Sequence, residues 1–403
     1  MAYRTVKIDW LPRSSQDWAT FTAVRMEAGR LWSWLVERHA DARQEGETWP
    51  GRDDLQKETK RQFPNLHSQS VQMTVHDFLE AIASVEALRQ RGEPYEYPHR
   101  KLRYRQVIFN GQAARSRDGC LILPCGKAGK ISIKIPDAVS FPGQVMEVRL
   151  NYGSIEVVCK IQEPVRSGGL IIGVDLGVNT LVAPTDGEKA ILVSGREIKA
   201  TVQLRNKTLA EITAKQFKKT KGSRRHKKLQ RRKYRMLDRA KNKVRDLCHK
   251  ATRKVADVFP NAKAYVGKPF NDASQKMGRR QAQTVSSACN RKLISMLNYK
   301  LAAAIEVNEA FSSQTCPVCG ERAKHCRVYR CRCGYEAPRD VVGCSNIRAI
   351  GIDGEMRPGC SVPNAVHQVV PDRYPGTSQV VPRAQGKSLG VVKTTNHPRT
   401  PRL

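Results

Sequence analysis

Acidic residues are scarce in this sequence. Its 403 residues include 71 lysines and arginines but only 37 aspartates and glutamates, so the formal net charge at pH 7 is +34. Such a charge opposes compaction and solubility unless a polyanion supplies counter-charge, and the commonest polyanion of this kind is nucleic acid. We therefore interpret the chain as a nucleic-acid-binding protein rather than as a basic protein without an anionic partner.

Long apolar segments are also missing. No run of apolar residues approaches the roughly 20 that cross a bilayer, and the opening segment MAYRTVKIDWLPRSSQDW contains no apolar signal sequence. These absences predict a cytoplasmic protein that does not associate with membranes. Because thiols stay reduced in the cytoplasm, the 12 cysteines indicate metal ligands rather than disulfides.

Four cysteines have the spacing of a zinc site. Two pairs, separated by eleven residues, can supply four thiolates to one tetrahedral zinc ion: Cys316, Cys319, Cys331 and Cys333. Gly320 directly follows the first pair, as in a zinc knuckle. Because four sulfur ligands leave no open coordination position, the spacing predicts a structural rather than a catalytic zinc ion.

The second cysteine pair has one intervening residue, which is tighter than the usual gap of two. Cys326 is therefore an alternative ligand. Its neighbours, His325 and Arg327, offer no knuckle turn, so we retain Cys331 and Cys333 as the predicted pair.

Hydrophobic periodicity in the first part of the chain predicts a helical segment inserted among strands. Residues 3–11 alternate as a strand does, and residues 16–91 carry apolar side chains at helical spacing, such as Phe78 and Ile82. Two prolines follow, and short strands separated by Gly, Asp and Pro then continue to about residue 164.

The second part of the chain predicts an RNase H-like fold. A meander of three strands over residues 168–197 precedes a helical hairpin that ends near residue 259. A strand, a helix, a second strand over residues 303–312, the cysteine cluster and a last helix follow. This is the element order of an RNase H-like fold. The tail after residue 359 has little apolar periodicity, and we expect it to be disordered.

Basic side chains concentrate in the helical hairpin. Residues 215–254 contain 19 lysines and arginines against two aspartates. A helix with this imbalance repels itself in water and is stabilised when phosphates lie against it, whereas a solvated charged face is the simpler alternative. The predicted nucleic-acid-binding residues are Lys218, Lys219, Arg224, Arg225, Lys228, Arg231, Arg232 and Arg235.

Two aspartates are predicted ligands of a divalent metal. In an RNase H-like fold, carboxylates from distant parts of the chain converge on two ions about 3.5–4 Å apart, which assist phosphodiester hydrolysis. Mg²⁺ prefers such oxygen ligands. Asp175 ends an apolar strand, where an unpaired carboxylate is costly. Asp340 opens the last helix, where it is either a second ligand or a helix N-cap.

Three segments, with the basic helices between them, resemble the TnpB family of transposon-encoded RNA-guided nucleases, which are relatives of type V CRISPR effectors. The segments are IIGVDLGVNTLVAPTDG, SSQTCPVCG and YRCRCGYEAPRDVVGCSNI, and the resemblance covers about residues 168–350. It implies a guide RNA that pairs with target DNA while the protein recognises a short flanking motif. It also implies a prokaryotic, cytoplasmic protein, catalytic Mg²⁺, structural Zn²⁺, and a monomer or dimer bound to RNA.

The resemblance implies a RuvC-like nuclease domain, of RNase H-like fold, with an inserted zinc ribbon. A β-barrel wedge domain carrying a helical recognition insertion precedes it, so the expected class is α/β with several domains. The boundaries that follow are 1–15 and 92–165 for the wedge, 16–91 for the recognition insertion, 166–311 and 339–358 for the nuclease domain, 312–338 for the ribbon, and 359–403 for the tail.

The sequence departs from the family at the middle catalytic carboxylate. In the family this is a Glu that closes the fourth strand, whereas the corresponding stretch here has Gly267 and Lys268. Strand alternation groups Glu309 with Ile305 and Val307 on one face, which we expect to point inward. Strands lie about 4.8 Å apart, a gap that a Glu side chain spans. Related family members with a relocated glutamate agree with this position.

Three outcomes therefore remain open for the middle carboxylate. Glu309 replaces it, Asp272 replaces it, or the site is inactive. The leading predicted function is an Mg²⁺-dependent RNA-guided DNA endonuclease with catalytic residues Asp175, Glu309 and Asp340. The alternatives are a guided DNA-binding protein that does not cut, acting like a repressor, and a zinc-ribbon protein that binds nucleic acid without a guide.

Overall fold

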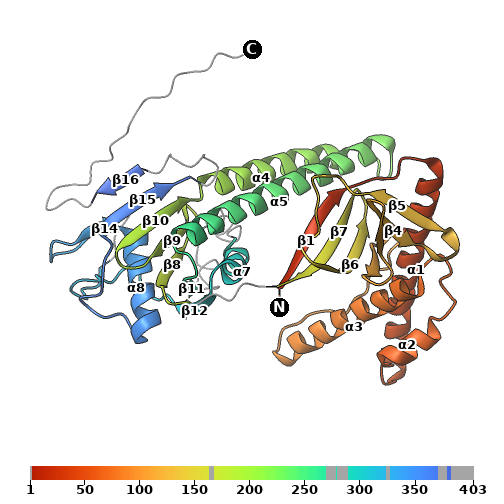
Figure 1. The fold of residues 1–403 in the computed structure, drawn as a ribbon, viewed down its shortest axis with the longest axis horizontal. Helices are drawn as coiled ribbons and strands as arrows, with labels where there is room; N and C mark the ends of the chain where they lie inside the picture. The colour runs from red at the N-terminus through yellow and green to blue at the C-terminus, as the bar shows by residue number, and fades with distance from the viewer. Residues whose placement is uncertain are drawn as a thin grey trace, which may run out of the picture. The chain divides into compact units, whose positions relative to one another are not determined.

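The computed structural model describes residues 2–162, 168–268, 289–323, 327–370 and 379–382, together with Gly278 (Figure 1). The chain divides into two compact units, Met1–Pro164 and Val165–Leu403, and each combines helices with strands. Among the described helices, none is both long and apolar enough to cross a membrane.

The first unit consists of three helices and two antiparallel sheets. The larger sheet has the strand order β1-β7-β6-β2, with β1 (Ala2–Asp9), β7 (Ser154–Ile161), β6 (Gln144–Asn151) and β2 (Val107–Asn110). The smaller sheet contains β3 (Arg115–Arg117), β4 (Cys120–Pro124) and β5 (Lys130–Lys134), with the short helix η1 (Gly126–Ala128) between the last two.

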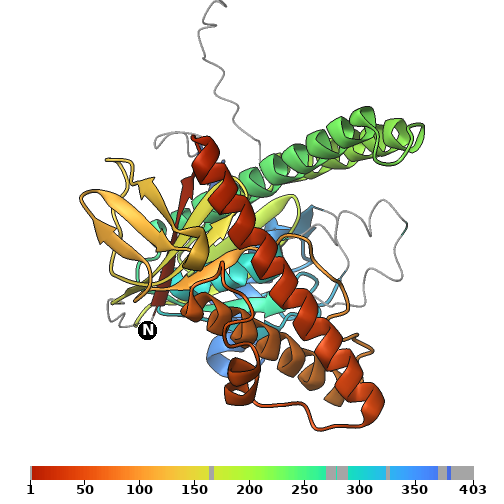
Figure 2. The same cartoon turned by 90° about the vertical axis from the view of Figure 1, so that its right-hand side faces the viewer.

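The helices of the first unit are α1 (Ser15–Glu45), α2 (Arg52–Glu58) and α3 (Ser68–Gln90), which lie within the expected helical insertion. Figure 2 shows α1 and α3 side by side. The resemblance implied a β-barrel for this part of the chain. The described strands of residues 2–162 pair into the two antiparallel sheets, and α3 packs against β2 and α1 against β5.

The second unit is built on one mixed sheet with the strand order β12-β11-β8-β9-β10-β15-β16. Its strands are β8 (Ile171–Leu176), β9 (Thr180–Thr185), β10 (Lys189–Ser194), β11 (Lys263–Lys268), β12 (Ala303–Asn308), β15 (Ala365–Val369) and β16 (Gln379–Pro382). The predicted meander is antiparallel β8-β9-β10, and β11 runs parallel to both β8 and β12.

Helices cover both faces of this sheet. The hairpin of α4 (Arg196–Phe217) and α5 (Arg224–Val258) and the helix α7 (Asn290–Lys300) provide one layer, and α8 (Arg339–Asp353) packs across β8 to β12. Strand alternation in β8 divides its side chains between the layers. Ile172 and Val174 join the core with α5 and α7, whereas the next residue, Asp175, faces α8.

The expectation of disorder after residue 359 is wrong for residues 365–369. They form β15, which pairs in parallel with β10 and is followed along the sheet by β16. The pairing satisfies backbone groups at the edge of β10, and Val369 is buried in the core of the unit. Five residues are too few to show a strand periodicity in the sequence, so the tertiary partner decides this element.

The close approach of α8 to β8 predicts that Gly173 is essential for stability. A Cβ on Gly173 would collide with the backbone oxygen of Cys344 and the backbone nitrogen of Arg348. We expect Gly173→Ala to destabilise the unit by about 1–3 kcal/mol, because overpacking forces the helix away from the sheet. Thermal unfolding measures the change, with Gly169→Ala as control, since its Cβ meets no described atom within 4 Å. Equal melting temperatures for the two variants would contradict this packing argument.

Candidate active site and zinc-binding site

Asp175 lies near the end of β8 and faces α8. Gly343 of α8 leaves room for its side chain, because a Cβ at position 343 would lie only 2.9 Å from Oδ2 of Asp175. The backbone N–H of Leu176 donates a hydrogen bond to the carboxylate. The two glycines Gly173 and Gly343 thus allow helix and strand to enclose a carboxylate that forms no ion pair within the described residues.

Asp340 lies in the first turn of α8, close enough to Asp175 to raise the pKa of that residue. It does not cap the helix, because the N-cap residue is Pro338 and no side chain makes a cap hydrogen bond. The alternative interpretation of Asp340 as an N-cap is therefore wrong, and its carboxylate is free of that structural role.

Glu309 directly follows β12 and reaches across the neighbouring strand β11. A Cβ on Gly267 would collide with Oε2 of Glu309, so the carboxylate lies over the glycine. The last paired residues of β11 and β8 are Val266 and Val174. Gly267 and Asp175 are the next residues of these two strands. The Glu309 carboxylate therefore reaches the strand end adjacent to Asp175, where the sequence itself has glycine and lysine.

The inward face expected for β12 is only partly correct. Val307 is half-buried, but Ile305 is 39% exposed, because β12 is the edge strand of the sheet. The position of Glu309 depends on the missing side chain of Gly267 more than on a buried face of its own strand. Asp272, the alternative acid, lies outside the described residues.

The three carboxylates interact electrostatically. Burial raises the pKa of Asp175 to about 7, and the neighbouring charges of Asp340 and Glu309 add to this effect, whereas Arg339 opposes it. Burial also raises the pKa of Glu309. Their oxygens do not all lie within 4.8 Å of one another, a spacing that in the described chain only the cysteine cluster meets. Oxygen donors of this kind, near a half-buried carboxylate without an ion pair, suit a divalent cation.

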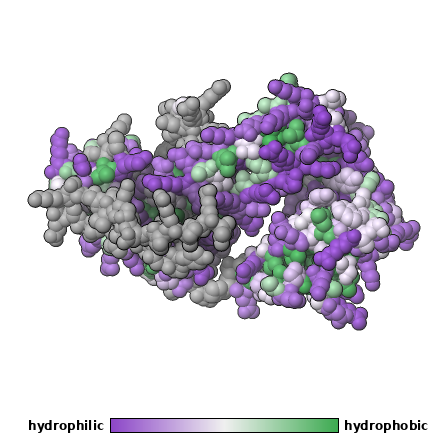
Figure 3. All heavy atoms as spheres, turned by 90° about the horizontal axis from the view of Figure 1, so that it is seen from above, coloured by the Kyte–Doolittle hydropathy of each residue, from purple (hydrophilic) through white to green (hydrophobic). Residues whose placement is uncertain are grey.

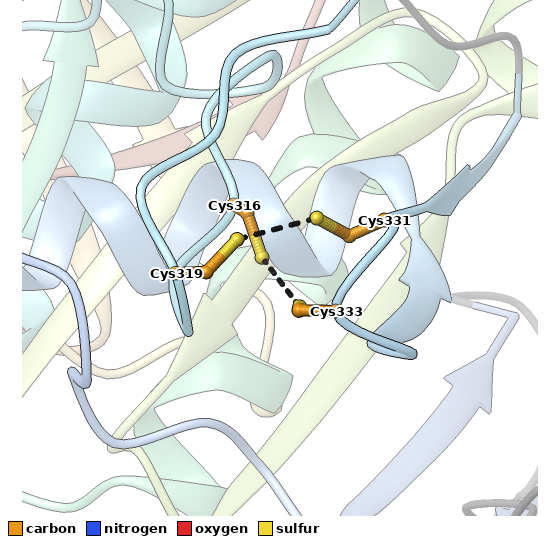
Figure 4. Close-up of side chains that lie close together, drawn as sticks. All are labelled: Cys316, Cys319, Cys331 and Cys333. Atoms are coloured by element: carbon orange, nitrogen blue, oxygen red, sulfur yellow. Dashed lines mark hydrogen bonds between the residues drawn. The ribbon is translucent and has the colours of Figure 1, made fainter.

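The predicted zinc ligands converge in the structure (Figure 4). The Sγ atoms of Cys316, Cys319, Cys331 and Cys333 all lie within 4.8 Å of one another. Cys316 and Cys333 are 3.7 Å apart at sulfur, and Cys319 and Cys331 are 3.3 Å apart. Zn–S bonds of about 2.3 Å place tetrahedral sulfurs about 3.8 Å apart, so the cluster fits a zinc ion. Cys326 lies outside the described residues.

Both cysteine pairs form tight turns that end in glycine. The N–H of Gly320 donates to the carbonyl of Cys316, and the N–H of Gly334 donates to the carbonyl of Cys331. Both glycines have positive φ, 80° and 87° respectively, which is the conformation that favours glycine. The second pair therefore forms a turn despite its shorter spacing, a feature that Gly334 in the sequence could have indicated.

The segment that carries the four cysteines, residues 312–338, is here called the zinc module. One buried asparagine joins it to α8, the helix of Asp340. The side-chain nitrogen of Asn346 donates to the backbone oxygens of Ser312 and Thr315, at 2.6 and 2.7 Å. These two hydrogen bonds attach α8 to the start of the zinc module, which closely follows Glu309 in the chain. Sequence reasoning missed Asn346, since a single polar residue in a short helix carries no distinguishing pattern.

The predicted nucleic-acid-binding residues lie at the turn between α4 and α5 and in the first part of α5. All eight are exposed: Lys218, Lys219, Arg224, Arg225, Lys228, Arg231, Arg232 and Arg235. Hydrophilic surface predominates over these helices (Figure 3). Arg232 and Arg235 also line a groove of about 550 Å³ between the two helices, with Leu204 and Met236 as apolar members. The arrangement offers a dense positive surface to a polyanion.

The buried carboxylates predict that the stability of the metal-free chain depends on pH. Because the folded pKa of Asp175, about 7, exceeds its ordinary value of 3.8, the folded state holds the proton more tightly than the unfolded state. This stabilisation is complete below about pH 4 and is lost as the pH rises through about 7, a difference of roughly 4 kcal/mol. We expect the melting temperature in Mg²⁺-free buffer without chelator, which leaves the cysteine site intact, to fall over this range and millimolar Mg²⁺ to restore it at pH 8.

Asp175→Asn is the diagnostic variant for this pH dependence. It should remain stable at pH 8 in Mg²⁺-free buffer and should not respond to Mg²⁺, whereas Asp137→Asn, at an exposed position, should behave as wild type. A wild-type melting temperature that does not change with pH in Mg²⁺-free buffer would show that Asp175 is not enclosed as described.

The cysteine cluster predicts one zinc ion per chain. Elemental analysis of the purified protein should give this ratio, and Cys331→Ser or Cys333→Ser should each lower it, because a tetrahedral structural site needs all four thiolates. Cys344→Ser is a matched control, since this buried thiol donates to the carbonyl of Val341 instead. Zinc retained in Cys333→Ser but lost in Cys326→Ser would assign the ligands differently.

Two family models match the chain. Residues 154–268 match a family described as "Probable transposase", and residues 291–347 match "Cas12f1-like, TNB domain". In a cryo-EM structure of a Cas12f1–sgRNA–target DNA complex, Cas12f1 has a similar fold, with a TM-score of 0.54 at 10% identity over 81% of this chain and 82% of that one.

Three curated proteins are also similar in sequence. The chain is 31% identical over 133 residues to "TnpB-like protein MJ1635" and 32% identical over 142 residues to "TnpB-like protein MJ0012", both of Methanocaldococcus jannaschii. It is 27% identical over 221 residues to "Putative RNA-guided DNA endonuclease InsQ" of Escherichia coli. The match to MJ1635 spans 32% of that protein and 32% of this chain, and the match to MJ0012 spans 65% of that protein and 33% of this chain. The match to InsQ spans 54% of that protein and 50% of this chain. These matches support a TnpB family member, and each spans less than two thirds of the curated relative's own length.

Proposed function

We propose that the chain is a transposon-encoded RNA-guided DNA endonuclease that hydrolyses phosphodiester bonds next to a short flanking motif. The observation that carries this proposal is the mutual approach of three carboxylates, Asp175, Glu309 and Asp340, around a strand end. They come from β8, from the residue after β12 and from α8, which is the convergence that metal-assisted hydrolysis requires.

The three carboxylates have a shared role in this proposal. Asp175, half-buried between Gly343 and the sheet, would hold the metal together with Asp340 and Glu309, the two carboxylates near it. Bound Mg²⁺ supplies positive charge that activates the attacking water and stabilises the leaving oxygen. Since the pKa of Asp175 is about 7 without metal, the residue must lose a proton before it can act as a ligand.

Glu309 would replace the glutamate that the family places at the end of the fourth strand. Its carboxylate lies over Gly267, so the missing side chain of one strand makes room for the acid of the next. A Cβ at position 267 would lie 2.2 Å from Oε2 of Glu309, so a larger residue there would force this carboxylate to move. The same argument makes Lys268 compatible with an intact site, because it is exposed at the end of β11.

The proposed partners are a guide RNA and a target DNA. Cas12f1 is bound to an sgRNA and target DNA in the similar structure, and InsQ is named for RNA-guided DNA cleavage. The eight exposed basic residues of the α4–α5 hairpin supply charge for phosphate contacts. Base pairing with the guide would select the sequence, and the first unit, as the wedge and recognition region, would read the flanking motif.

A guided DNA-binding protein that does not cut is the second candidate. Two observations favour it: the oxygens of the three carboxylates are not all within 4.8 Å, and the family position for the middle acid is occupied by glycine and lysine. This candidate shares the RNA and DNA partners of the first and differs only in catalysis.

The test is cleavage by the full chain with the RNA that co-purifies with it, identified by sequencing. We expect Glu309→Ala and Asp175→Ala each to lower Mg²⁺-dependent cleavage by about 100-fold or more while guided DNA binding changes by less than about twofold. Binding depends on phosphate contacts and base pairing over a large surface, whereas hydrolysis needs every metal ligand.

Matched variants separate the alternatives. Glu306→Ala removes an exposed acid of the same strand and should leave cleavage unchanged. Gly267→Ala should impair cleavage as Glu309→Ala does, because the new Cβ displaces that carboxylate. Cleavage that persists in Glu309→Ala would exclude the relocated glutamate. A wild type that binds but never cuts, and cuts after Lys268→Glu, would identify the binding-only protein.

A further inference from the structure

An aromatic cluster on the first unit encloses an arginine without an acidic partner. The cluster, here called the aromatic platform, consists of Trp18, Phe21, Arg25, Tyr104 and Tyr152. The guanidinium carbon of Arg25 lies 5.1 Å from the ring centre of Phe21, 5.5 Å from that of Tyr152 and 5.7 Å from that of Tyr104. Trp18 contacts the rings of both Phe21 and Tyr152, at 5.7 and 6.5 Å.

Three separate segments build the platform, and backbone hydrogen bonds fix their positions. Trp18, Phe21 and Arg25 share one face of α1, at spacings of three and four residues. The N–H of Arg105, next to Tyr104, donates to the carbonyl of Arg25. Tyr152 lies in the two-residue turn between β6 and β7, which is held by a hydrogen bond from the N–H of Trp10 to the carbonyl of Gly153.

Arg25 lacks the partners that a purely structural arginine has. Its Nε is buried without a hydrogen-bond partner, as is the Nε of the neighbouring Arg105, but among the described residues no carboxylate pairs with the Arg25 guanidinium. Arg105, a neighbouring half-buried arginine, is by contrast paired with Asp77 at 2.8 Å. Burial lowers the pKa of Arg25, and the nearby hydroxyls of Tyr104 and Tyr152 oppose this change. The enclosed cation therefore has rings around it but no anion.

The rings above Arg25 are open to solvent. Tyr152 is 65% exposed, Tyr104 is 40% exposed and Trp18 is 36% exposed, whereas Phe21 beneath them is buried. A cluster that served the core alone would bury these rings or pair its cation. Exposed aromatic faces beside an unpaired guanidinium match the chemistry of an unpaired nucleotide, whose base stacks on rings and whose phosphate accepts from arginine.

We propose that the aromatic platform binds one unpaired nucleotide, with its base stacked on Tyr152 or Trp18 and its phosphate against Arg25. Arg103, whose guanidinium carbon lies 5.4 Å from the ring centre of Tyr104, adds a second positive charge at the same place. The platform rests on the nucleic-acid-binding part of the proposed function and does not depend on the carboxylates, which belong to the other unit.

Photocrosslinking of the full chain tests the platform. The probes are oligouridylate and oligothymidylate of about 12 nucleotides, each with one thiolated base, in EDTA so that cleavage plays no part. We expect crosslinked peptides that contain Trp18, Tyr104 or Tyr152. Tyr152→Ala should lower the crosslink yield at this segment by roughly tenfold, since stacking is worth about that factor or more, and Tyr152→Phe should keep it.

Two further variants complete this test. Tyr3→Ala removes an exposed tyrosine of the same unit that has no ring contact with the platform, and should leave the yield unchanged. Arg25→Gln should lower the yield and reduce the salt dependence of binding by about one phosphate contact. The probe that crosslinks at lower concentration distinguishes RNA from DNA as the natural source of the nucleotide.

The outcome that would overturn the platform is specific. It is crosslinking confined to the α4–α5 hairpin, with Tyr152→Ala indistinguishable from Tyr3→Ala. A chain that cuts DNA under guidance but gives this result lacks the platform and keeps the proposed function. A chain that never cuts but crosslinks at Tyr152 has the platform without the nuclease.

Discussion

The burial of negative charge beside α8 is the constraint on which the second unit depends. Asp175 is enclosed between a strand and a helix, near two further carboxylates that raise its pKa, and only a proton or a cation can relieve this repulsion. Glycines at the contact between helix and sheet make this enclosure sterically possible. Gly173 and Gly343 allow the enclosure, and Gly267 admits the third acid. In the proposed function, a metal ion would offset the cost of this enclosure.

The zinc module has a mechanical connection to this site. It lies in the chain between Glu309 and Asp340, and Asn346 ties its first segment to α8 by two short hydrogen bonds. A zinc ion bound by both cysteine pairs would therefore also fix the positions of the neighbouring segments that carry Glu309 and Asp340. Positive charge occurs in two different settings. It is exposed on the α4–α5 hairpin, and it is enclosed by aromatic rings at Arg25. Basic residues farther along the hairpin are paired with acids, as Lys243 is with Glu197, whereas in the described part of the chain neither Arg25 nor the eight predicted binding residues form an ion pair.

Local patterns were sufficient for much of the fold. The long helices, the β8-β9-β10 meander and the four cysteine ligands depend on spacings within a few residues of one another, so periodicity and turn chemistry predicted them. The position of Asp175 could also be predicted from the sequence, because a carboxylate at the end of an apolar strand seldom has a structural role. The disorder expected after residue 359 was wrong for residues 365–369, because β10, a strand far away in the chain, pairs with them.

The sequence by itself determined the excess of positive charge, the grouping of the four cysteines and the position of Asp175 near the end of an apolar strand, since residue type and short spacing carry that information. Only the tertiary structure decided that Glu309 lies over Gly267, that β15 joins the sheet, and that Arg25 is enclosed by Tyr104 and Tyr152. Each of these depends on segments brought together by packing, and a one-dimensional pattern does not record which side chain fills the space that another leaves.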